Sequence, residues 1–164
     1  MKNIITAIVA AVMLLSAAQA ADVRTEKWVN PAKAFKAYDE GDYETALSIF
    51  KVMAERGNSG AQSIVGQMYA QGSGVTQNYV EAARWLRLAA RQGFAEAQLR
   101  LSFLYSSGDG VTQNHVEAAK WLLLAAKQGD AAAQYFLSGK YFEGIGVIKD
   151  QVTAYMWANI GAPK

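Results

Sequence analysis

The 164-residue sequence contains no cysteine, only two prolines and a single histidine. Without cysteine, the chain can form no disulfide, and it has neither a thiolate metal ligand nor a thiol nucleophile. A metal site needs several ligands in a supported geometry, which the lone His115 cannot supply. The sequence therefore predicts no metal and no cofactor, and a fold that rests on packing alone.

Charge is also sparse. The 16 basic and 14 acidic side chains leave a formal net charge of +2. An excess this small offers little attraction to a phosphate backbone, so we expect no nucleic-acid partner. The most apolar stretch, from Ile4 to Leu15, is shorter than the roughly 20 residues that a membrane-spanning helix requires.

The first twenty residues have the pattern of a signal peptide. Lys2 precedes the apolar stretch, and Ala18-Gln19-Ala20 follows it as a site of small residues suited to cleavage. We expect cleavage after Ala20, export to the periplasm or beyond, and no stable membrane insertion of the processed chain. An uncleaved anchor is the alternative, whereas a lipoprotein is excluded because there is no cysteine to acylate. Residues 21–30 are expected to be a linker.

The sequence is rich in internal repetition. Aligning residues 72–98 with residues 108–134 gives 20 identities in 27 positions, at a spacing of 36 residues. Other markers recur at this spacing, namely Tyr69, Tyr105 and Tyr141, and Trp85, Trp121 and Trp157. A fixed period of this length is typical of solenoid proteins, in which each unit packs on the next.

Each period predicts two helices, and polar and glycine residues mark where the second one begins and ends. The expected N-caps are Asp42, Asn78, Asn114 and Asp150, and the closing glycines are Gly57, Gly93 and Gly129. Asn and Asp side chains accept from the free amides of a first turn, and glycine adopts the left-handed conformation that closes a helix. Glu81 and Glu117 are expected to complete capping boxes. Such a helix pair cannot bury its apolar face alone, so stacking is expected.

The repeated pattern A-Q-x-x-[VL]-[GS]-x-x-Y-x-x-G-x-G-V, followed by W and by A-A-x-Q-G, resembles the Sel1-like repeat family. This family is related to tetratricopeptide repeats and has a longer loop inside each unit. The resemblance covers residues 58–93, 94–129 and 130–164, whereas residues 31–57 resemble a tetratricopeptide unit with a shorter turn. It implies an all-α, right-handed α-solenoid that is concave on the side of each first helix.

Related tetratricopeptide proteins hold peptides on this concave side, so the resemblance implies a protein partner bound in a groove. Positions that are offset from the framework of each first helix are expected to line it. They are Ser63, Gln67, Leu99, Arg100, Phe103, Tyr135 and Phe142. Large apolar groups on an exposed face are typical of binding surfaces. The alternatives are that a tightly wound solenoid buries these side chains and that Arg100 is merely solvated.

The last helix offers a second candidate surface. No polar capping helix is expected after Tyr155, Met156 and Trp157, so these side chains could meet a partner or a second copy of the chain. A homo-oligomer formed through this C-terminal face is therefore possible. The alternative is that they pack back on Tyr141 and Leu137.

One motif requires comparison with an enzyme. Ser48 and Lys51 match the S-x-x-K pattern of penicillin-recognising enzymes, and some secreted Sel1-like proteins have been linked to penicillin binding. The accompanying S-D-N and K-T-G motifs are missing, so no catalytic residue is predicted. We expect an exported, non-enzymatic adaptor that binds a protein segment. The alternative is an envelope protein that binds or acts on a small cell-wall-derived ligand such as a β-lactam.

Overall fold

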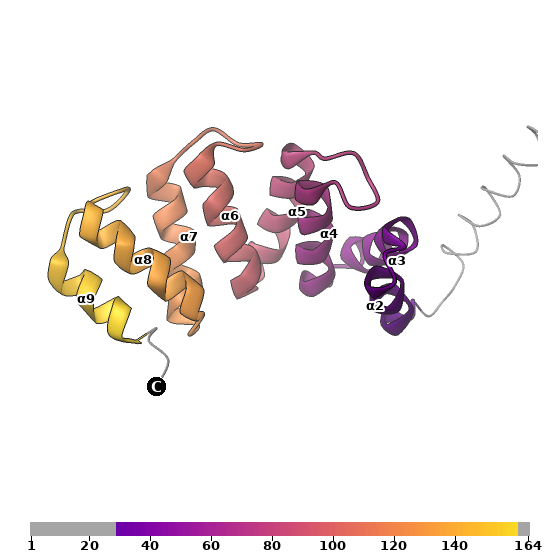
Figure 1. Ribbon diagram of the computed structural model, residues 1–164, viewed down its shortest axis with the longest axis horizontal. Helices are drawn as coiled ribbons and strands as arrows, with labels where there is room; N and C mark the ends of the chain where they lie inside the picture. The colour runs from indigo at the N-terminus through magenta and orange to yellow at the C-terminus, as the bar shows by residue number, and fades with distance from the viewer. Residues whose placement is uncertain (1–28, 161–164) are drawn as a thin grey trace, which may run out of the picture.

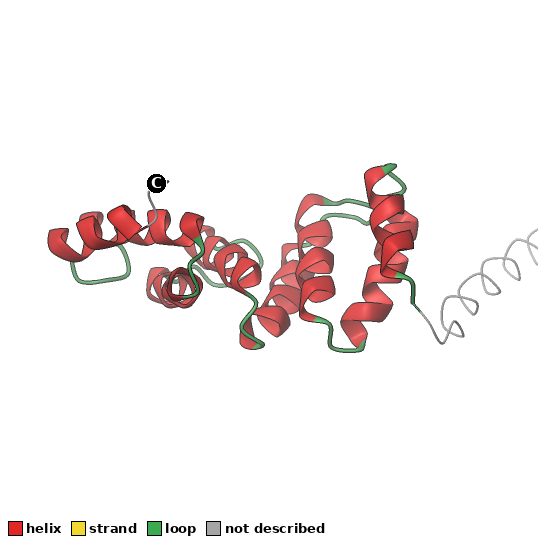
Figure 2. Cartoon of the chain, turned by 90° about the horizontal axis from the view of Figure 1, so that it is seen from below, coloured by secondary structure: helices red, strands yellow, loops and turns green. Residues whose placement is uncertain are grey.

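The computed structural model describes residues 29–160, which form eight α-helices joined by loops, with no strand in this range (Figures 1 and 2). The helices are α2 (Pro31–Asp39), α3 (Tyr43–Glu55), α4 (Ser59–Gln71), α5 (Tyr79–Arg91), α6 (Ala95–Ser107), α7 (His115–Lys127), α8 (Ala131–Glu143) and α9 (Gln151–Ile160). Figure 1 shows the pairs following one another in a single curved row from indigo α2 to yellow α9. The predicted right-handed α-solenoid is confirmed. The predicted signal peptide lies outside the described residues.

The second helix of each pair begins where its polar cap predicts. The Asp42 carboxylate accepts from the Thr45 amide at 3.1 Å, and the Asn114 side chain accepts from the Glu117 amide at 3.0 Å. Asn78 and Asp150 each accept from two amides of the first turn of their helices. The four predicted N-caps are confirmed, because the donors of a first turn otherwise lack partners.

The expected capping boxes are wrong. The backbone amide of Asn78 donates to the Tyr69 carbonyl of the preceding helix at 2.9 Å, and the Asn114 amide donates in the same way to Tyr105. The long loop thus turns back onto its first helix and occupies the donor that a capping box needs. Glu81 instead forms an ion pair with Arg84 on the solvent side of α5.

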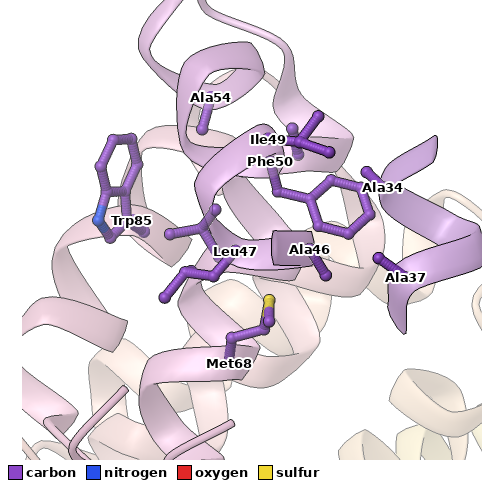
Figure 3. Packing of buried hydrophobic residues seen from close by; sticks show 11 residues of the cluster. Ala34, Ala37, Ala46, Leu47, Ile49, Phe50, Ala54, Met68 and Trp85 are labelled. Atoms are coloured by element: carbon purple, nitrogen blue, oxygen red, sulfur yellow. The ribbon is translucent and has the colours of Figure 1, made fainter. Parts of the chain in front are cut away.

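Neighbouring pairs share their cores. In the first cluster, Phe50 of α3, Met68 of α4 and Trp85 of α5 are all buried. Figure 3 shows the Phe50 ring beside Ala34 of α2, with Trp85 on the other side of the cluster. Because one cluster draws on α2 to α5, neither helix pair completes it alone, as stacking of incomplete units predicts.

A buried glutamine also joins each pair to the pair before it. The Gln98 amide donates to the Ala90 carbonyl near the end of α5 at 3.1 Å, and its oxygen accepts from Gln128 at 2.8 Å. Gln62 makes the equivalent bonds one repeat earlier. Buried amides of this kind are costly when unpaired, so the Ala-Gln marker of the sequence fixes the register between pairs.

Among the four N-caps of the second helices, two are aspartates that can titrate and two are asparagines that cannot. A side-chain hydrogen bond from Thr153, with further bonds from backbone amides, holds the pKa of Asp150 below its usual value. Thr45 does the same to Asp42. Since the folded-state pKa is lowered, the stabilisation is complete above the ordinary carboxyl pKa of about 4 and is lost as pH falls below it.

Acid should therefore loosen α9 before α7, because α7 is capped by Asn114, which has no charge to lose. Hydrogen exchange of the first-turn amides, measured at about pH 4 and pH 3, should show reduced protection at Val152 and Thr153 but not at Glu117. An Asp150→Asn variant should remove this difference. Equal acid loosening of both helices in the unmodified chain would show that the caps are not its cause.

Candidate functional site

The predicted groove residues divide into covered and exposed positions. Ser63 is only 2% exposed, so the expectation that it lines an open groove is wrong. The equivalent position one repeat later, Leu99, is half-buried and packs against the core cluster of α7 and α8. This side of the first helix therefore faces the next pair, which covers it. Gln67, one turn further along α4, is half-buried.

Exposed aromatic rings gather on two successive first helices. The Phe103 ring of α6 and the Phe136 ring of α8 meet edge to face, with centroids 5.0 Å apart. Tyr135 contacts Phe136 in the same geometry at 5.6 Å. Phe103 and Phe136 are each 41% exposed, and Tyr135 is 69% exposed. We call these three residues the aromatic face. Edge-to-face contacts hold its rings in place, so a ligand would meet a largely ordered apolar surface.

Phe136 was not among the predicted site residues. It occupies the position that Arg100 holds one repeat earlier and Ile64 two repeats earlier. Arg100 was predicted, so applying the 36-residue period to it would have identified Phe136. The contact with Phe103 joins neighbouring pairs, and a pattern within one repeat does not encode it.

Arg100 and Phe142 flank the aromatic rings along the sequence. The Arg100 guanidinium contacts the Glu96 carboxylate of its own helix at 2.7 Å, a pair that contributes little to stability at the surface. Phe142 is 58% exposed near the end of α8, and the Lys149 ammonium lies 5.9 Å from the centre of its ring. Burial lowers the pKa of Lys140 on α8, an effect that the Glu143 carboxylate opposes.

The three C-terminal candidates do not behave alike. Trp157 is half-buried and packs against the cluster that contains Leu137 and Tyr141, as the alternative reading predicts. Tyr155 is 74% exposed and Met156 is 49% exposed. Of the three candidates, Tyr155 and Met156 are therefore the ones that are exposed on α9.

The S-x-x-K residues do not form a catalytic pair. The Ser48 hydroxyl donates to the Thr45 carbonyl at 2.8 Å, which is an ordinary bond within a helix. The Lys51 ammonium lies 3.5 Å from the Tyr69 hydroxyl on the neighbouring helix. A serine nucleophile requires a base within hydrogen-bond reach, and neither of these bonds joins Ser48 to Lys51.

The described residues contain neither a metal-binding cluster nor a membrane-spanning helix. Over residues 29–160, no group of three or more histidine or acidic side chains is placed to hold a metal ion. Over the same range, no helix combines the length and hydrophobicity needed to cross a bilayer. His115 is exposed in the first turn of α7.

The matches to a known family coincide with the helix pairs α4–α5, α6–α7 and α8–α9. A family model of the Sel1 repeat matches residues 59–94, 95–130 and 131–162. The crystal structure of a Sel1 repeat protein from Oxalobacter formigenes has a TM-score of 0.77 and 35% identity, covering 81% of this chain and 55% of that one. The structure of c5321, a protective antigen present in uropathogenic Escherichia coli strains, has a TM-score of 0.74 and 36% identity. The match covers 77% of this chain and 28% of that one.

A curated relative matches over a shorter stretch. The exopolysaccharide production negative regulator of Rhizobium leguminosarum bv. viciae is 44% identical over 48 residues. The match covers 29% of this chain and 18% of the regulator, so the chain spans only a small part of that protein.

Proposed function

Because this chain belongs to the Sel1 repeat family, whose repeats typically mediate contacts between proteins, we propose that it is an exported adaptor that binds a protein segment on its aromatic face. The family is a non-catalytic scaffold, and the proposed role is accordingly non-enzymatic. Binding would use Phe103, Tyr135 and Phe136, with Phe142 at the edge. Export is the part of the proposal that rests on the signal-peptide pattern of residues 1–20.

The single observation that carries the proposal is the exposure of three contacting aromatic rings on α6 and α8. Aromatic side chains bury a large area on binding and lose little conformational freedom, which is why they dominate protein interfaces. The rings lie on α6 and α8, the first helices of their pairs, and related tetratricopeptide proteins use their first helices to hold peptides. The preferred partner would present apolar side chains that can pack against the exposed sides of the rings.

The positions of the aromatic face differ between repeats, whereas the framework does not. Phe103 replaces Gln67 of the preceding repeat, and Tyr135 replaces Leu99, while the buried Ala-Gln pair is the same in all three repeats. A framework that stays constant while its surface varies supports recognition of one particular segment.

Phe103→Glu and Tyr135→Glu should each weaken partner binding by about 30-fold or more, the effect of removing an interface hot spot of at least 2 kcal/mol. Tagged protein would be cross-linked in the native cell envelope and its partners identified by mass spectrometry. The affinity of each purified partner would then be measured for the unmodified chain and both variants. Circular dichroism should be unchanged, because both side chains are exposed.

Leu88→Glu on α5 is the matched control. Leu88 is 39% exposed, an exposed fraction similar to that of Phe103. It lies on a second helix, outside the aromatic face. Partners that bind through the face should be retained by this variant and lost by the other two. If every partner binds all three variants equally well, the aromatic face is not the binding site.

A further inference from the structure

Lys140 of α8 occupies a position that is apolar in the two earlier repeats. Its equivalents at the 36-residue spacing are Met68, which is fully buried, and Leu104, which is 8% exposed. Each of them belongs to an apolar cluster shared with the second helix of the preceding pair. Lys140 itself is half-buried. A lysine can pack its methylene chain at such a position only where its ammonium group reaches water or a polar partner.

The Lys140 ammonium lies on the side of α8 that carries the aromatic face. Lys140 follows Phe136 by four residues, and side chains four residues apart on a helix lie on the same side. Glu143, three residues further on, is exposed, and its carboxylate acts electrostatically on the Lys140 ammonium. The ammonium is therefore directed outward, and Lys140 lies about 6 Å from Phe136 along the helix axis.

This cation has no ion-pair partner in the described part of the chain. Within residues 29–160, Lys140 forms no ion pair, and Glu143 acts on it only from a greater distance. Arg100 of α6, by contrast, contacts the Glu96 carboxylate at 2.7 Å. Burial lowers the pKa of Lys140, because the charged form is less well solvated here than in water. A carboxylate supplied by a ligand would stabilise that charged form.

We infer that the aromatic face and Lys140 together recognise an extended protein segment in which an acidic side chain follows an apolar one by two residues. Side chains two residues apart in an extended segment lie on the same side, about 6–7 Å from each other. This distance matches the separation of Phe136 and Lys140 along α8. The apolar side chain packs on the rings while the carboxylate meets the ammonium. The inference rests on the proposed adaptor function, because the segment must bind on the aromatic face.

Selection from a displayed library of short random peptides tests this preference. Peptides that bind the unmodified chain but not Phe103→Glu are retained, because these use the aromatic face. We expect the retained sequences to be enriched in Asp or Glu two residues after an apolar residue. One such peptide is then synthesised with its acidic residue and, as a matched probe, with the corresponding amide. Fluorescence anisotropy gives the dissociation constant of each.

Lys140→Met removes the charge and suits the fold, since Met68 fills the equivalent buried position. It should raise the dissociation constant of the acidic peptide about fivefold at low salt and leave that of the amide peptide unchanged. Glu143→Gln removes the competing carboxylate and should tighten the acidic peptide. Lys127→Met, in the exposed last turn of α7, removes the same charge outside the face and should have no effect.

The outcomes separate this inference from the proposed function. If the retained peptides show no acidic preference, or if Lys140→Met binds both probes as the unmodified chain does, the inference is overturned while the adaptor function stands. If no selected peptide depends on Phe103, both are overturned. A circular dichroism spectrum shared by all variants confirms that the changes in affinity arise from the contact and not from loss of the fold.

Discussion

Replacing Leu101 with alanine should lower the free energy of unfolding by about 3–4 kcal/mol. Leu101 is fully buried in the middle of α6, in the cluster that α5 and α6 share. The substitution removes buried apolar surface and leaves a cavity that rigid helices on both sides can only partly close. Urea unfolding followed by circular dichroism measures the loss. Small domains have only about 5–15 kcal/mol of stability, so the transition should move strongly.

Leu88→Ala is the matched control for this change. Both leucines lie inside helices, so the change in helix propensity is the same, but Leu88 is 39% exposed on the outer side of α5. Replacing Leu88 with alanine should lower the free energy of unfolding by less than about 1 kcal/mol. Equal losses in the two variants would mean that the helices do not present the faces described above. Because Leu101 lies between pairs, its variant should also broaden the transition as the two ends of the stack uncouple.

The regular framework could be predicted from the sequence because its determinants are local. Asn78 and Asn114 cap their helices through amides two or three residues away, and Gly93 and Gly129 adopt positive φ just after the same helices end. Such signals need no knowledge of neighbouring pairs. The 36-residue period then supplied the order of the helices and the need for stacking.

The errors arose where contacts between helices decide the outcome. The sequence predicts Ser63 in an open groove, but this residue is only 2% exposed, and Trp157 packs back on the helix before it in its own pair. Phe136 was missed because its partner Phe103 belongs to the preceding repeat. A repeat pattern gives the position of each residue within one unit, but not how far the next unit covers it. The candidate site was therefore identified by type and region, and only in part by residue.

The loops of the solenoid provide the second large effect, because each is seated on the pair before it. Gly110, in the loop between α6 and α7, has a φ of 67°. A methyl group at this residue would overlap the backbone carbonyl group of Tyr79 at the start of α5. Gly74 and Gly146 lie in the same way against Tyr43 and His115. Gly110→Ala should therefore lower the free energy of unfolding by about 2–4 kcal/mol, because the backbone must move to relieve the overlap. Thermal or urea unfolding measures the loss.

Gly93→Ala separates this overlap from backbone strain. Gly93 also has a positive φ, of 88°, but an added methyl group would meet no atom within 4 Å. Gly93→Ala should therefore lower the free energy of unfolding only by the strain of a left-handed alanine, about 1–2 kcal/mol. The excess at Gly110 is then the contribution of close contact between the loop of one pair and the helix of the previous one. If both alanines cost the same, the loops are not seated on their neighbours, and the stack depends on its apolar clusters and buried glutamines alone.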